Sequence, residues 1–230
     1  MIDVSRGRVV RLLGFSIFFL AVLSVSGQFC KYYLGHPSVF GLVDLFDLSL
    51  EQSVPNYFSS LLLVLCSLLA GILAVLAEKK GLAFKNHWTG LCFIFLYMSV
   101  DENASIHELT MKPLREIFHL TGYFYFAWVL LGMFFVVSMV IIYSKFVFRL
   151  PKKIRGMVIL AGSIYVSGVI GAEILQAPYA ARHEDALITI PMGLVEELME
   201  MSGLVIFINA LFLFIQSIQG PKPLEINVTD

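Results

Sequence analysis

Six long apolar stretches dominate the chain, at residues 9–28, 57–76, 88–107, 123–146, 157–176 and 190–215. A helix that crosses the hydrocarbon core of a bilayer needs about 20 mainly apolar residues. Each stretch has that length, although the third, fifth and sixth also contain acidic residues. The pattern predicts an all-α fold: one domain over residues 1–230, built as a bundle of six transmembrane helices.

Composition supports a membrane protein. Hydrophobic residues make up 58% of the chain and charged residues 14%, against about 45–50% and about 25% in soluble domains. The basic start and first apolar run lack an Ala-x-Ala cleavage site, so we expect a retained helix rather than a signal peptide. The three cysteines are too few and too scattered for a disulfide framework. No basic patch favours nucleic-acid binding.

The basic residues predict an orientation, because Lys and Arg accumulate on the cytoplasmic side of membrane proteins. With six helices and a cytoplasmic N-terminus, most of the 16 basic residues fall in cytoplasmic segments. These are Arg6, Arg8, Arg11, Lys79, Lys80, Lys85, Lys145, Arg149, Lys152, Lys153, Arg155 and Lys222. Only Lys31, Lys112, Arg115 and Arg182 fall outside. The bias predicts that both termini are cytoplasmic.

The first external loop, residues 29–56, is the longest loop. Within it, Asp44, Asp47 and Glu51 have the i, i+3, i+7 spacing of one helical face. This spacing predicts a short helix lying on the membrane surface.

Acidic side chains on three predicted helices should meet in the outer half of the bilayer. The third helix ends with Asp101, Glu102, His107 and Glu108, and the fifth carries Glu173. The sixth carries Glu196, Glu197 and Glu200 in its first half. At about 100° per residue, Asp101, Ser105 and Glu108 should share one helical face, with His107 beside Asn103. The small residues of the fifth helix should allow close helix contact.

The negative charge of these carboxylates must be neutralised, because an ionised residue at the centre of a membrane helix costs roughly 2.5–3.5 kcal/mol. Either several hold protons or a bound cation neutralises them. Carboxylates with imidazole are ligands for divalent metals, and some helical bundles hold two metal ions this way. The expected ligands are Asp101, His107, Glu108, Glu173, His183, Glu197 and Glu200, supported by Glu102 and Glu196. None of these candidate residues forms the Glu-x-x-His spacing of ferritin-like di-metal proteins.

Simpler roles remain open for several of these residues. Glu102 could solvate the end of its helix, and Glu196 or Glu197 could interact with a helix dipole. His107 could form a structural hydrogen bond instead of binding metal. Haem is disfavoured, because only His107 and His183 could pair at matched depth.

The segments 46–51, 54–60, 101–108 and 196–203 together resemble a family of bacterial multi-pass membrane proteins with no established activity. The resemblance implies a bacterial origin and the inner membrane. The chain differs from the metal-dependent membrane hydrolases of the ceramidase and adiponectin-receptor type. These have seven helices and a His-x-x-x-His on the last, where this chain has Glu196-x-x-x-Glu200.

These features favour a metal-dependent membrane enzyme that acts on a lipid or membrane-soluble substrate at the extracytoplasmic face. Its expected partners are the lipid bilayer, other membrane proteins or a second copy of itself. Two alternatives stay open: a proton- or cation-coupled carrier, and a non-catalytic subunit or assembly factor of a membrane complex. Against a carrier, the sequence shows no inverted repeat and no paired Gly/Pro break.

Overall fold

The computed structural model describes residues 5–182 and 186–219, which form helices joined by short turns, with no strand among them. The main helices are α1 (Arg6–Tyr32), α3 (Val54–Lys79), α4 (Lys85–Ala104), α6 (Val129–Arg149), α7 (Lys152–Val166), α8 (Glu173–Ala181) and α9 (Ala186–Gln219). The shorter ones are α2 (Leu42–Leu45), η1 (His107–Thr110), α5 (Met111–Phe118) and η2 (Gly122–Phe124). A π-helical segment, η3 (Ser167–Ala172), joins α7 to α8. The all-α class is therefore confirmed.

Within the described residues, five helical segments are long and apolar enough to cross a membrane. They are Arg6–Tyr32, Val54–Lys79, Val129–Arg149, Lys152–Ala181 and Ile188–Gln219. The predicted span 88–107 is present as α4, which packs along α3, but it is not among the five. Its polar ends, Lys85-Asn86-His87 and Asp101-Glu102-Asn103, lower its hydropathy. The structure thus shows five candidate spans where the sequence predicts six.

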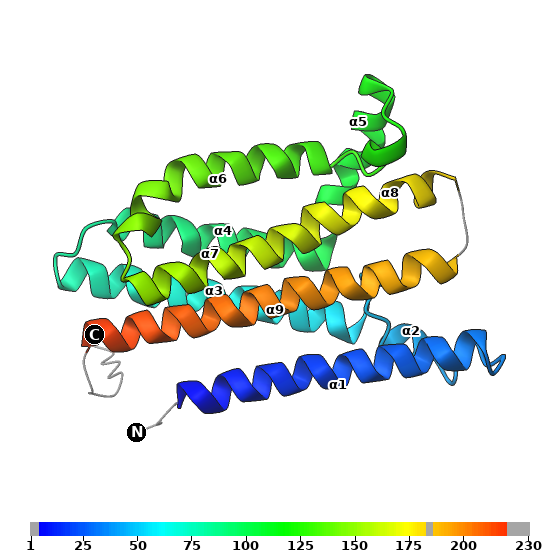
Figure 1. Ribbon diagram of the computed structural model, residues 1–230, viewed down its shortest axis with the longest axis horizontal. Helices are drawn as coiled ribbons and strands as arrows, with labels where there is room; N and C mark the ends of the chain where they lie inside the picture. The colour runs from blue at the N-terminus through cyan, green and yellow to red at the C-terminus, as the bar shows by residue number, and fades with distance from the viewer. Residues whose placement is uncertain (1–4, 183–185, 220–230) are drawn as a thin grey trace.

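The long helices lie side by side, and α5 stands across one end of the bundle (Figure 1). The central helix is α9, which contacts α1, α3, α7 and η3. The start of α1 and the end of α9 lie at the same end (Figure 1). There, Arg6 Nη1 donates to Asn209 Oδ1 at 3.0 Å, and Lys80 Nζ donates to the carbonyl oxygen of Ile218.

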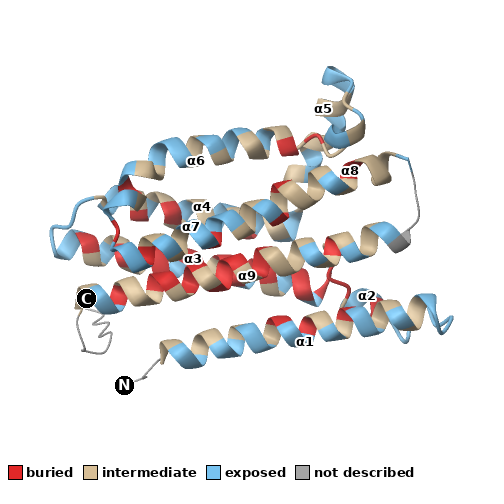
Figure 2. Cartoon of the chain, in the orientation of Figure 1, coloured by how far each residue is buried: buried red, intermediate tan, exposed pale blue. Residues whose placement is uncertain are grey.

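Burial is concentrated where α3 faces α9 (Figure 2). Leu63 and Leu73 of α3 and Ile208 of α9 are fully enclosed. By contrast, Phe134 and Ile141 of α6 are 74% and 70% exposed. Contiguous exposed apolar surface on a soluble protein is rare and marks an interaction site. Here it covers the outer helices, so lipid is its natural environment.

Local sequence explains where these helices begin and end. The hydroxyl of Ser53 accepts from the backbone N–H of Asn56 at 3.2 Å and caps α3, with Pro55 in its first turn. Pro151 holds Leu150 extended and separates α6 from α7. At the end of α4, Ser105 adopts a left-handed φ of 52° and stops the helix.

The loop over residues 29–56 differs from its prediction. The helix within it is only the single turn α2, and Asp47 lies beyond it, 5% exposed. Asp44, Asp47 and Glu51 therefore do not share one face of a surface helix. Gln28 Nε2 donates to Asp47 Oδ2, while the N–H and hydroxyl of Ser49 donate to Asp47 Oδ1. These hydrogen bonds turn the carboxylate inward.

Candidate functional site

The carboxylates predicted on three helices come together inside the bundle. Glu196, Glu197 and Glu200 lie on α9, Glu173 begins α8, and Glu102 lies near the end of α4. Electrostatic interactions link Glu200 to each of the other four and link Glu197 to Glu102. Glu200 is 7% exposed. We call these five residues the interior carboxylate cluster.

The π-helical segment η3 sets the distance between α7–α8 and α9. Gly168 in this segment faces α9 so closely that a Cβ there would lie 3.0 Å from Glu200 Cγ and from the Glu196 carbonyl oxygen. A side chain at this position would push Glu200 away. Insertions of this kind in α-helices occur frequently at functional sites, and this one lies directly against the cluster.

A second group of charged residues lies outside the spans, where α4 ends. Because Ser105 stops α4, the chain turns and brings His107 back to Asp101. The backbone N–H of His107 donates to Asp101 Oδ1 at 2.9 Å, and its Nδ1 lies 3.1 Å from Asp101 Oδ2. Its Nε2 lies 4.0 Å from Glu51 Oε1. We call Glu51, Asp101 and His107 the mouth triad.

The surroundings of the mouth triad shift two pKa values. Burial lowers the pKa of His107, but the hydrogen bond and charge of Asp101, with Glu51 and Glu108, outweigh burial and raise it above its ordinary 6.5. Burial also raises the pKa of Glu51 above 4.5; Glu108 adds to this effect and His107 opposes it. Glu51 and His107 therefore hold their protons more tightly than the same groups do in water.

Two sequence predictions at this turn are wrong. Glu108 does not share a helical face with Asp101 and Ser105, because α4 ends at Ala104; Glu108 lies exposed in η1. His107 does not lie beside Asn103 but contacts Asp101 instead. The structural hydrogen bond considered for His107 is therefore present.

Neutral polar side chains that the sequence analysis overlooked surround the carboxylates. The indole of Trp128 lies 4.8 Å from the His107 ring, centroid to centroid, and donates to Glu173 Oε1 at 3.3 Å. Gln176 Nε2 donates to Glu196. Asn56 Nδ2 donates to the backbone carbonyl of Glu102 at 3.0 Å. Gln176 could have been found from sequence, because it is a polar residue inside an apolar span.

The helix-dipole interpretation of Glu196 and Glu197 fits poorly, because α9 begins at Ala186 and both residues lie well inside it. Glu197 Oε2 is instead buried without a hydrogen-bond partner, and so is Asn56 Oδ1. A buried oxygen that accepts no hydrogen bond is costly unless a proton or a cation reaches it. Both atoms are of the type that hard cations bind.

In the described part of the chain, the ligands expected from the sequence fall into two separate groups. Within residues 5–182 and 186–219, no group of three His, Cys, Asp or Glu side chains has an arrangement that could hold a metal ion. Asp101 and His107 lie in the mouth triad, while Glu173, Glu197 and Glu200 lie in the interior carboxylate cluster. Of the two other candidate ligands, Glu108 lies exposed in η1 and His183 lies outside the described residues.

No curated protein and no solved structure matches the chain. The family model described as a domain of unknown function, DUF8692, matches residues 15–215. Because this match covers most of the chain, including the mouth triad and the interior carboxylate cluster, the chain belongs to that family.

Proposed function

We propose that the protein is a membrane-embedded enzyme whose interior carboxylate cluster binds a divalent metal ion and acts on a lipid or membrane-soluble substrate. The observation that carries the proposal is the unpartnered Glu197 Oε2, buried among four further carboxylates. Closely packed buried carboxylates cannot all ionise unless a cation neutralises them. The unpartnered Oε2 of Glu197 is an oxygen that could coordinate such a cation.

The ligands we favour are Glu102, Glu197 and Glu200, because these three interact with one another. An all-oxygen set suits Mg²⁺, Mn²⁺ or Ca²⁺. Their side chains would have to rotate to gather around an ion, since the structure does not hold them in a coordination sphere. Gln176 and Asn56 would orient Glu196 and Glu102 beside it.

We further propose six membrane crossings, with α4 as the third, in the inner membrane of a bacterium with both termini in the cytoplasm. The start of α1 and the end of α9 lie at one end of the bundle, as an even number of crossings requires (Figure 1). Arg6 and Lys80 lie at that same end, in line with the cytoplasmic preference of basic residues. The bacterial membrane rests on the family resemblance alone.

A specific observation also favours a second function, a proton-coupled carrier. The sequence shows no paired Gly/Pro break, but the π-helical segment η3 interrupts the α-helical geometry of the span Lys152–Ala181 beside Glu200. Transporters place substrate sites at interrupted helices. The mouth triad and the interior carboxylate cluster would then relay protons along one route.

Metal binding by purified variants tests the enzyme against the carrier. We expect wild type in detergent to bind one or two equivalents of Mn²⁺ or Mg²⁺, measured by elemental analysis and calorimetry. Glu197→Gln should weaken binding at least about 10-fold, since even changes outside the ligand shell cost roughly 10–100-fold. The matched control is Glu78→Gln. Glu78 is an exposed carboxylate at the end of α3 far from the interior carboxylate cluster, where it pairs with Lys85 of α4.

The proposal would be overturned by a wild type that binds no metal, or by a Glu197→Gln protein that binds it like wild type. Proton uptake into proteoliposomes that contain the wild type, lost in Glu200→Gln, would then favour the carrier. Size-exclusion profiles and circular dichroism of each variant separate loss of binding from loss of folding.

A further inference from the structure

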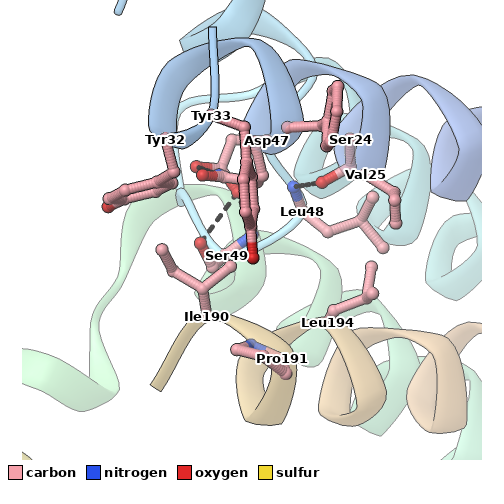
Figure 3. Close-up of a pocket in the computed structure, with 12 residues that line it drawn as sticks. Ser24, Val25, Tyr32, Tyr33, Asp47, Leu48, Ser49, Ile190, Pro191 and Leu194 are labelled. Carbon is pink, nitrogen blue, oxygen red and sulfur yellow. Dashed lines mark hydrogen bonds between the residues drawn. The ribbon is translucent and has the colours of Figure 1, made fainter. Parts of the chain in front are cut away.

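A cleft opens between α1 and α9 (Figure 3). It lies near the start of α9, the helix that carries Glu196, Glu197 and Glu200. Its volume is about 300 Å³, the lower end of the range of small-molecule pockets, roughly 300–1,000 Å³. Most of its wall is apolar: Val25 and Phe29 of α1 face Ile190, Pro191 and Leu194 of α9. A cleft of this size suits one segment of a hydrocarbon chain and a small polar group.

One end of the cleft is polar. Gln28 and Ser49 line it together with Asp47, whose carboxylate accepts hydrogen bonds from both. The amide of Gln28 is only half satisfied, because its Nε2 donates to Asp47 while its Oε1 is buried without a donor. The Gln28 Oε1 atom therefore lacks a hydrogen-bond donor. A primary ammonium would supply that donor, and its positive charge would lie beside the negative charge of Asp47.

The rim of the cleft carries Tyr32 and Tyr33, the last residues of α1 and its C-cap (Figure 3). Aromatic side chains gather at the level of lipid headgroups. Val25 is 51% exposed and Phe29 52%, on a helix whose outer face is apolar. A cleft at headgroup depth that opens sideways to the bilayer would carry residues of this kind at its rim.

A short chain of contacts joins the cleft to the interior carboxylate cluster. A Cβ at Gly193 would lie 3.2 Å from Ser49 Cβ and 3.9 Å from Gln176 Oε1, and Gln176 donates to Glu196. About one turn of α9 thus separates the ligand position from the cluster.

We propose that this cleft binds a membrane phospholipid with a primary ammonium headgroup, the ammonium donating to Gln28 Oε1 and Asp47 and an acyl segment lying between Val25 and Leu194. The inference rests on the proposed function, because it names the substrate class of that same centre. Phosphatidylethanolamine has the required headgroup. Phosphatidylcholine has the same glycerophosphate and headgroup charge, but three methyl groups replace the N–H donors, so it serves as the control.

The test is photo-crosslinking in vesicles that carry phosphatidylethanolamine or phosphatidylcholine, each with the same diazirine-labelled acyl chain. In wild type we expect cleft peptides from α1 and α9 to be labelled several-fold more by the ethanolamine lipid. Val25→Trp should fill the cleft and remove this labelling. Val22→Trp, one turn back on the same helix, 45% exposed and outside the cleft, should not. Gln28→Leu should abolish the preference for ethanolamine.

Cleft labelling that equals labelling of the exposed face of α6, or that persists in Val25→Trp, overturns the proposal. Equal labelling by both lipids overturns the headgroup assignment. Metal content is measured on the same samples. If cleft labelling is lost or absent while metal is bound, only the cleft assignment fails. If labelling is specific but wild type binds no metal, the proposed metal-dependent enzyme is wrong and the lipid site is still supported.

Discussion

His107 is the residue at which pH should act on this protein outside the membrane. Its pKa lies above 6.5 mainly because the bond to Asp101 outweighs burial. A raised histidine pKa contributes stability that is complete below pH 6.5 and is lost as pH rises through the folded-state value. The raised pKa of Glu51 acts in the same direction, since its cost develops as pH rises above 4.5.

Thermal melts of wild type and His107→Gln at pH 5.5 and pH 8.5 measure this effect. The difference in melting temperature should be larger at pH 5.5 and should shrink at pH 8.5. The control is His119→Gln, which replaces an exposed histidine directly after α5. Its difference in melting temperature from wild type should be the same at both pH values. An equal difference at both pH values would mean that the charge of His107 does not stabilise the fold.

For single residues, the sequence indicated which polar side chains lie inside apolar helices, but not which side chains contact one another. Glu173, Glu197 and Glu200 could be placed together because hydropathy and chain direction suffice for that. The contact between His107 and Asp101 could not, because it depends on the positive φ of Ser105. Serine carries no strong signal for that conformation.

Among the helices, η3 is the element whose packing should be most sensitive to substitution. Gly168→Ala should destabilise the protein by about 1–3 kcal/mol through overpacking against Glu200. Gly162→Ala in α7 meets nothing within 4 Å, so it should be neutral or stabilise by up to about 1 kcal/mol. Denaturant unfolding in detergent compares the two. A Gly168→Ala protein as stable as Gly162→Ala would show that α7–α8 can move away from α9 at little cost.

Elements differed in how far sequence could define them. Long apolar runs gave α1, α3, α6 and α9 nearly whole, because their length alone implies a span. The π-helical segment has no such signature, since Ser167–Ala172 reads as an ordinary stretch of small and apolar residues. Only the single turn α2 is present where the sequence predicts a surface helix. Hydrogen bonds from Gln28 and Ser49 instead turn the Asp47 carboxylate inward.

For the whole molecule, the proposed six crossings require α4 to cross the membrane. Reporter fusions after Lys80 and after Lys112 bracket α4 and should report opposite sides, with Lys80 cytoplasmic. A fusion after Gln219 should agree with the one after Lys80, because six crossings return the chain to its starting side. If the fusions at Lys80 and Lys112 reported the same side, α4 would be a helix packed on α3 without spanning.

The placement of Trp128 gives the protein an optical reporter of its own. The chain has two tryptophans. Trp88 is buried, and its ring centroid lies 4.8 Å from that of Phe146. The indole of Trp128 instead contacts the His107 ring and donates a hydrogen bond to Glu173. A protonated imidazole quenches an excited indole by accepting an electron. In a Trp88→Phe protein, emission should therefore fall as His107 gains its proton and change again when a ligand reaches Glu173. Fluorescence could then follow the occupancy of this site without any added label.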